Sequence, residues 1–145
     1  MTNPIDQINP EGKPIIYVLA FYRGYEGDDA EQGTTNSNSH RAIAFGEWLQ
    51  RKFPNYLVYV PHKEVMCNEA WRQGLVDSDN VMDICKTIVK YSILGVALEP
   101  ISQGMAEEIA VANENDIPIV TSEGTGEKTF DDVALALAGI RYETE

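Results

Sequence analysis

The chain alternates short apolar runs with longer amphipathic segments, and this alternation constrains the fold more than any other feature. The apolar runs read as buried strands and cover Pro14–Phe21, Tyr56–Val60, Ser92–Leu98 and Ile117–Val120. Segments with apolar residues at helical spacing follow them and cover His40–Phe53, Val76–Lys90, Met105–Asn115 and Phe130–Gly139. Strands that alternate with helices favour a parallel sheet, so the sequence predicts a small doubly wound α/β fold of about four or five strands.

Polar segments are predicted to lie outside these elements. Residues 1–13 are expected to form a flexible arm before a single domain at residues 14–145. Asn36–Ser39 offers an N-cap to the helix that follows, and only a short helix at Glu69–Leu75 is expected between Lys63 and Leu75. The remaining polar stretches are predicted as two loops and a tail, Tyr25–Ser39, Thr121–Lys128 and Ile140–Glu145.

Charge and composition exclude several classes of partner. The net charge is −12, which disfavours a nucleic acid polymer because its phosphates would be repelled. No apolar run approaches the ~20 residues of a membrane span, and the N-terminus has no apolar signal segment. A cytoplasmic protein with no membrane partner is therefore expected.

Cysteine, histidine and nucleotide-binding motifs give no sign of a bound cofactor. Cys67 and Cys85 lack metal-type spacing and are expected to be reduced thiols in or near the core, and His40 and His62 are far apart. The chain has no P-loop, no dinucleotide fingerprint after the first strand and no nucleophile elbow. Neither a metal nor a cofactor is predicted.

The turn at Ser102–Ile109 is the leading candidate site. It leaves a predicted strand and opens a predicted helix, where free backbone N–H groups favour anions. Ligands of open α/β sheets bind at such strand ends. Glu108 lies beside the apolar stripe of this helix, near Gly104 one turn earlier. The alternative is a surface carboxylate that stabilises the start of the helix.

Other residues would join Glu108 if the strand ends converge. Arg23 and Gly24 follow the first strand, and an Arg beside a Gly suits a phosphate group. Ser102 and Ser122 follow other strands and offer hydroxyl groups, although turn chemistry alone explains each of them.

Two more residues are candidates with simpler explanations. Asp83 lies at the edge of an apolar stripe and would form a carboxylate pair with Glu108, as glycosidic cleavage requires; otherwise it is a helix-surface acid. Tyr17 lies within the first strand, where a core aromatic is the simpler interpretation.

Three of these motifs together resemble the nucleoside 2-deoxyribosyltransferase superfamily, which includes the 2'-deoxynucleoside 5'-phosphate N-hydrolases. The first is Ile16–Ala20 followed by Phe21–Gly24, and the second is Asp83, upstream of the key turn. The third is Ser102–Ala112, which resembles the family's Gly-x-Gly-x-Glu-Leu-Gly-x-Ala helix start. The resemblance extends over most of the chain, from Ile15 to Val120.

The resemblance implies a flavodoxin-like or Rossmann-like homo-oligomer that acts on a small nucleoside or nucleotide. Glu108 would attack C1' of the deoxyribose, Tyr17 would orient Glu108, and Asp83 would protonate or position the base. The residues that would bind the substrate are Phe21, Arg23, Gly24, Ser102, Gly104 and Met105, with Arg23, Gly24 and Ser102 at the 5'-phosphate or 5'-hydroxyl.

The chain departs from the family pattern in several places. Ala106 and Ala110 replace glycines of the motif, and Phe21 stands where the hydrolases tend to have a small polar residue. Transferases tend to have Asp at the position of Ser102, so Ser102 with Arg23 favours the hydrolase branch.

The resulting interpretation is cleavage or exchange of an N-glycosidic bond. The main alternative is a non-catalytic binding module for a nucleotide or a nucleotide-derived signal, because one fold hosts many functions. A phosphoribohydrolase of the cytokinin type is disfavoured because its Pro-Gly-Gly motif is absent.

Overall fold

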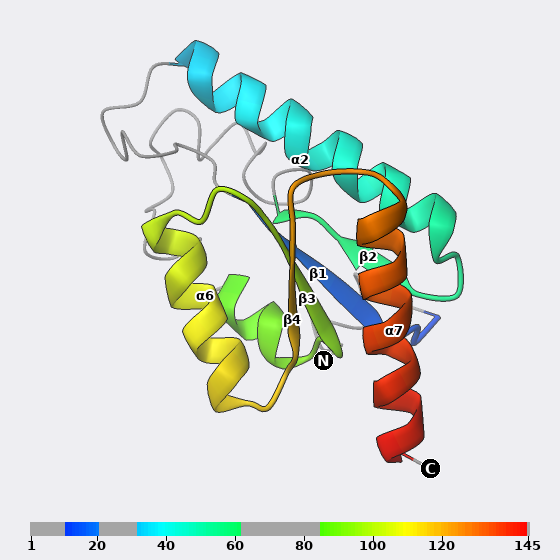
Figure 1. Cartoon of the computed structure of the whole chain (residues 1–145). Helices are drawn as coiled ribbons and strands as arrows, with labels where there is room; N and C mark the ends of the chain where they lie inside the picture. Colours follow the sequence, from blue (N-terminus) through cyan, green and yellow to red (C-terminus); the bar gives the residue numbers. More distant parts are fainter. Residues whose placement is uncertain (1–10, 21–31, 62–84, 145) are drawn as a thin grey trace.

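The structure is a computed structural model that describes residues 11–20, 32–61 and 85–144 (Figure 1). Within these residues lies one parallel sheet in the order β2-β1-β3-β4. Its strands are β1 (Ile15–Leu19), β2 (Leu57–Tyr59), β3 (Leu94–Leu98) and β4 (Ile119–Ser122). The predicted α/β fold is therefore confirmed.

Helices cover both faces of the sheet (Figure 1). Helices α2 (Gln32–Lys52) and α7 (Glu127–Thr144) pack on one face. Helix α6 (Gln103–Glu114) and a helical turn at residues 85–90 pack on the other. Successive side chains of a strand point to opposite faces, so Ile16 and Val18 of β1 contact the first pair, whereas Ile15, Tyr17 and Leu19 face the second.

The central strands are buried along their whole length, which explains their continuous apolar sequence. Every residue of β1 and β3 is buried, whereas the edge strands β2 and β4 are partly exposed. The strand order changes direction between β1 and β3, since β1 continues to β2 on one side and the chain returns to β3 on the other. Such a switch point is where ligands of open α/β sheets bind.

The layer of α2 and α7 is an apolar core. Its largest fully buried members include Leu49 of α2 and Val133 of α7, which pack with Ile16, Val18 and Val96 of the sheet. Gly46 allows α2 to approach the sheet closely, because a Cβ there would lie 2.2 Å from Cγ2 of Val60. This close approach fixes α2 against the end of β2.

Three predicted boundaries are wrong. Residues 32–39 belong to α2 rather than to the predicted loop, so Asn36–Ser39 does not cap the helix. Helix α7 begins at Glu127, inside the predicted Thr121–Lys128 loop, and continues to Thr144, so most of Ile140–Glu145 is helical rather than a tail. Once a helix is nucleated, each added residue gains a hydrogen bond, and that gain outweighs the weak helix propensity of polar residues.

The last strand is displaced from its predicted position. Residues Ile117–Val120 were expected, but β4 runs from Ile119 to Ser122. The N–H of Ile117 bonds to the carbonyl of Ala112 at the end of α6, and Pro118 has no N–H. Pairing with β3 therefore begins at the carbonyl of Pro118, which accepts from Gly95.

Several predictions lie outside the described residues and are not addressed by this structure. They are most of the N-terminal arm, the end of the first strand at Phe21, the segment from Tyr25 to Glu31, the short helix at Glu69–Leu75 and the first part of the helix at Val76–Lys90.

Candidate functional site

Ser102 sets the start of α6. It has an extended backbone, and its hydroxyl accepts a hydrogen bond from the N–H of Met105 at 3.2 Å. In return, the N–H of Ser102 points to the sulfur of Met105 at 3.5 Å. Such an N-cap satisfies backbone donors that the first turn leaves without partners. Because the cap fixes where the helix begins, it also fixes which residues of α6 turn inward, namely Met105, Glu108 and Ala112.

Glu108 is a buried carboxyl group that bonds directly to the sheet. It is 4% exposed, and its Oε2 accepts a hydrogen bond of 2.5 Å from the hydroxyl of Tyr17. Tyr17 lies at the middle of β1, is 0% exposed and pairs in register with Gly95 of β3. The structure therefore brings together Tyr17 of the central strand β1 and Glu108 of helix α6.

Burial is the main cause of the shifted pKa of Glu108. Loss of solvent raises the pKa of its carboxyl group to about 7, and the charge of Glu107 acts in the same direction. The hydrogen bond from Tyr17 and the charge of Lys86 partly oppose this by stabilising the ionised form. Near neutral pH, Glu108 is therefore present both as a proton donor and as a carboxylate.

The neighbours of this pair are also buried. The ring of Tyr59 on β2 stacks on that of Tyr17, with centroids 5.7 Å apart and planes inclined by 26°. Met105 and Cys85 belong to the same buried cluster. Burial, the charge of Glu108 and a hydrogen bond raise the pKa of Tyr17 well above its usual value, and burial raises the pKa of Cys85 to about 12. Both therefore stay protonated near neutral pH.

Cys85 and Tyr59 belong to the same buried cluster as Tyr17, a proximity that the sequence did not predict. Cys85 was expected only to be a core thiol, and Tyr59 only to be a strand residue. Two signals were present in the sequence: Cys85 lies two positions after the candidate Asp83, and Tyr59 lies in the strand predicted to follow β1. Only the strand register, which pairs Tyr17 with Tyr59, shows that the rings meet.

The other predicted site residues divide into two groups. Ser102, Gly104 and Met105 lie in the first turn of α6 or at its cap, and Met105 is buried beside Tyr17. The rest lie outside the described residues: Phe21, Arg23, Gly24 and Asp83.

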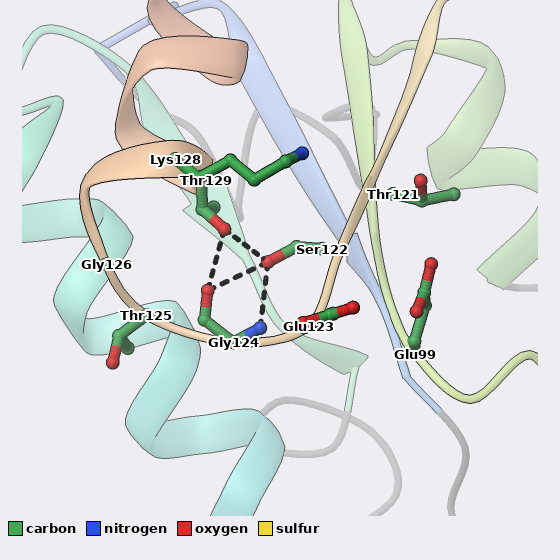
Figure 2. A pocket seen from close by; sticks show the side chains of 9 residues that line it. All are labelled: Glu99, Thr121, Ser122, Glu123, Gly124, Thr125, Gly126, Lys128 and Thr129. Carbon is green, nitrogen blue, oxygen red and sulfur yellow. Dashed lines mark hydrogen bonds between the residues drawn. The ribbon is translucent and has the colours of Figure 1, made fainter.

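Ser122 does not join the Glu108 cluster but belongs to the turn between β4 and α7 (Figure 2). Its hydroxyl lies 2.7 Å from that of Thr129, both hydroxyls lie 2.8 Å from the carbonyl oxygen of Gly124, and the N–H of Gly124 donates back to Ser122. Gly124 and Gly126 have positive φ angles of 150° and 145°, which favour glycine. The predicted donor is thus engaged in holding this turn.

The turn borders an open pocket of about 280 Å³ at the carboxyl ends of β3 and β4 (Figure 2). The pocket is lined by acidic Glu99 and Glu123, by Lys128 and by small polar residues. Lys128 forms an ion pair of 2.9 Å with Asp132 one turn further along α7. These contacts identify the pocket as a polar surface feature, separate from the buried Tyr17–Glu108 pair.

Comparisons with known proteins identify no relative of this chain. No protein family, no curated protein and no solved structure matches it. Among the residues that the structure describes, no three His, Cys, Asp or Glu side chains gather into a metal-binding group. No helix in the same ranges combines the length and apolarity that crossing a bilayer requires.

Proposed function

We propose that this protein cleaves or exchanges the N-glycosidic bond of a 2'-deoxynucleoside or its 5'-monophosphate, with Glu108 as the nucleophile. The observation that carries the proposal is the buried hydrogen bond between Tyr17 and Glu108. Burying a carboxyl group is costly, and a strongly shifted pKa caused by burial and a specific partner marks a functional-site candidate. A small-molecule substrate and a homo-oligomeric assembly are parts of the same proposal.

The position of the pair supports this chemistry. Tyr17 binds Oε2 of Glu108, which leaves Oε1 to approach a substrate carbon. The phenol stabilises the carboxylate form, the only form able to attack. Tyr17 lies on β1 and Glu108 lies on α6, the helix that follows β3, so the pair lies close to the two strands that flank the switch point of the sheet. Ligands of such folds bind at this point.

In the first step, Oε1 of Glu108 forms an ester bond to C1' of the deoxyribose. The bond between C1' and the base nitrogen breaks, and the base leaves with that electron pair and takes a proton. In this proposal Asp83 supplies the proton, as the resemblance implies. Splitting one difficult displacement into two easier ones is the advantage of nucleophilic catalysis.

In the second step, water or a second base attacks C1' and breaks the ester bond. Its proton passes to Asp83, and Glu108 returns to its carboxylate form. Two displacements at C1' retain the configuration of the sugar. Arg23, Gly24 and Ser102 are proposed to hold the 5'-phosphate or 5'-hydroxyl, with Phe21, Gly104 and Met105 lining the rest of the pocket.

The test is base release by the purified chain from each deoxynucleoside and each deoxynucleoside 5'-monophosphate, measured by chromatography. We expect Glu108→Gln to reduce release at least ~10³-fold, as loss of a nucleophile does. Glu107→Gln is the matched control, because it removes an exposed carboxylate from the neighbouring position of α6. Its release rate should stay within about twofold of the wild-type rate, since surface changes have small effects.

A trapping experiment asks whether the route is covalent. A 2'-fluoro-2'-deoxyarabinonucleoside slows the second step, so the intact mass should increase by one sugar and the label should map to Glu108. Wild-type rates in Glu108→Gln would contradict the proposal.

The binding module remains the second candidate because Glu108 is almost fully buried. The hydrogen bond between a buried carboxyl group and a phenol also satisfies both polar groups in a purely structural pair. A folded protein that binds a nucleotide without releasing its base would identify this second function.

A further inference from the structure

The two edges of the sheet differ in how their outward backbone groups are satisfied. At the β2 edge, the side-chain amide of Gln50 on α2 lies against the strand. Its Oε1 accepts a hydrogen bond from the N–H of Val58 at 3.0 Å, and its Nε2 donates to the carbonyl of Tyr56 at 2.8 Å. An unpaired strand edge is a template for another strand, and natural proteins cover such edges. Gln50 therefore closes part of the β2 edge with a side chain.

The β4 edge has no such cover among the described residues. The carbonyls of Pro118 and Ser122 accept hydrogen bonds from β3 at 3.0 and 2.8 Å. Alternate residues of a strand bond to the same neighbour, so the N–H and carbonyl groups of Ile119 and Thr121 point away from β3. No described residue bonds to these groups. Figure 1 shows β4 at the edge of the sheet, between α6 and α7.

Helix α7 has a strip of small residues beside this edge. Asp132, Ala136 and Gly139 lie on one side of the helix, because they are spaced by four and three residues. Ala136 and Gly139 line an open groove of about 430 Å³ together with Pro118, which precedes β4. A Cβ at Gly139 would meet no described atom within 4 Å. Asp132 is paired with Lys128 at 2.9 Å, so another helix can approach this strip without meeting an unpaired charge.

A second copy of the chain matches the β4 edge in register. In an antiparallel pair of strands, two opposite residues exchange both of their N–H···O bonds. A two-fold axis at Val120 sets Ile119 of one copy opposite Thr121 of the other, so every outward backbone group of β4 meets a partner. Such an interface uses the same patch on both copies and closes after two of them.

The same symmetry brings the two α7 helices to a packing distance. Helix α7 contacts both β3 and β4, so it lies over the space between these strands. Neighbouring strands are about 4.8 Å apart, which sets the two symmetry-related helices roughly 10 Å apart on one face of the joined sheet. Helices pack at about 8–10 Å, and the small side chains of Ala136 and Gly139 suit this distance.

We propose that the β4 edge and the α7 strip of Asp132, Ala136 and Gly139 form a dimer interface, with Val120 at the two-fold axis. The described four-stranded sheets of two copies then join into one. The proposal rests on the homo-oligomeric part of the proposed function and is independent of glycosidic cleavage. An extended peptide of another protein also bonds to an edge strand, but it leaves the strip of α7 without a partner.

The first test is the mass of the full chain in solution, measured by analytical ultracentrifugation over a series of concentrations. The wild type should have twice the mass of one chain. Ala136→Arg places a bulky charge between the two α7 helices and should raise the dissociation constant at least ~100-fold, because an unpaired buried charge is costly. Ala138→Arg, at an exposed position of the same helix, is the matched control and should change the constant by about twofold at most.

A backbone variant tests the strand pairing directly. Thr121→Pro removes one outward N–H and leaves the bonds to β3 in place, which is where edge strands tolerate proline. It should raise the dissociation constant at least ~10-fold, while circular dichroism shows that the variant is folded. In the wild type, the amides of Ile119 and Thr121 should resist hydrogen exchange, and in Ala136→Arg they should exchange quickly.

A cross-link in the otherwise unchanged dimer tests the register. Val120→Cys sets two cysteines directly opposite each other, with Cα atoms about 4.5 Å apart, which is within the range of a disulfide. Mild oxidation should therefore link the two copies above the level seen in the wild type. Thr121→Cys is the control, because its two cysteines would lie on a diagonal about 7–8 Å apart and should not link.

Several results would overturn the proposal. A monomer at every concentration would do so and would leave the edge to an extended segment of another protein or of the same chain. A dimer unaffected by both Ala136→Arg and Thr121→Pro, or a Val120→Cys variant that links no better than the wild type, would place the interface elsewhere.

Base release by the same samples distinguishes this proposal from the proposed glycosidase, because none of the substituted residues belongs to the proposed catalytic site. A dimer that links through Val120→Cys but releases no base would support the interface and contradict the glycosidase. Base release that depends on Glu108 in a chain that stays monomeric would support the glycosidase and overturn the interface.

Discussion

The two faces of the sheet bury similar apolar side chains but differ in the kind of polar group that each one buries. The face under α2 and α7 is lined by Ile, Val, Leu and Phe side chains. The face under α6 contains, among comparable apolar residues, the hydrogen-bonded pair Tyr17 and Glu108 and the buried thiol of Cys85. An apolar core of the first kind already meets the needs of stability. The polar groups of the second face are the ones on which the proposed function rests.

The buried hydroxyls of Ser122 and Thr129 sharpen this contrast. They are neutral and bond to each other and to Gly124 in a turn. Glu108 is ionisable, and its pKa of about 7 places its charge change near neutral pH. Buried polarity alone therefore does not separate the two faces, whereas a buried group that titrates does.

The largest expected effect is on the apolar face. Leu49→Ala should lower the free energy of unfolding by about 2–5 kcal/mol, because it leaves a cavity under a fully buried side chain. Denaturant unfolding measures this loss, with Leu135→Ala as the control on the exposed surface of α7. The midpoint of the Glu108 titration, followed by ¹³C NMR of its labelled carboxyl carbon, should not change in either variant. A moved midpoint in Leu49→Ala would show that the two faces are not independent.

The next effect is the pH dependence of stability on the site face. The pKa of about 7 keeps the proton on folded Glu108 up to near neutral pH, whereas the unfolded carboxyl group releases it near its ordinary pKa of 4.5. The folded state thus binds more protons in this window, and the free energy of unfolding falls as pH rises through it. Between these pH values, burial of the Glu108 carboxyl group should lower the free energy of unfolding of the wild type by on the order of 3 kcal/mol. This decrease should be absent in Glu108→Gln. Parallel stability curves for wild type and variant between pH 4.5 and 7 would contradict the assigned pKa.

The smallest expected effect is the change in the pKa of Glu108 when the hydroxyl group of Tyr17 is removed. Tyr17→Phe keeps the stacked ring but removes the donor that stabilises ionised Glu108, so its pKa should rise further, by roughly one unit. The ¹³C titration measures this shift. Tyr56→Phe, on the apolar face, is the control and should leave the midpoint in place. A lower midpoint in Tyr17→Phe would show that the phenol stabilises the protonated acid instead.

The strands were predictable because burial on both faces leaves a continuous apolar run. Residues Leu94–Leu98 fall inside the predicted Ser92–Leu98, and α6 begins at Gln103, close to the predicted start at Met105. The start of α2 was not predictable in the same way. Its first residues are mostly polar and poor helix formers, and the buried Ala42 and Phe45, which give the helical spacing, lie further along the same helix.

The candidate site was partly predictable for a related reason. Glu108 stood out because its distance from a strand end is fixed within one strand–turn–helix unit. Tyr17 was placed near it only through a family resemblance, and Cys85 was not placed there. Their proximity to Glu108 depends on the register between strands and on helix packing. These are long-range properties that local periodicity does not encode.

The bond between Tyr17 and Glu108 joins residues 91 positions apart in the sequence. Contacts of such long separation require closure of a large loop, which slows folding and leaves them to form with the tertiary structure as a whole. A chain in which β1, β2 and β3 have already folded still lacks the carboxyl group of Glu108 at this site until α6 packs on the sheet. The site therefore forms only when α6 packs against β1, and a chain folded as far as β3 does not yet contain it.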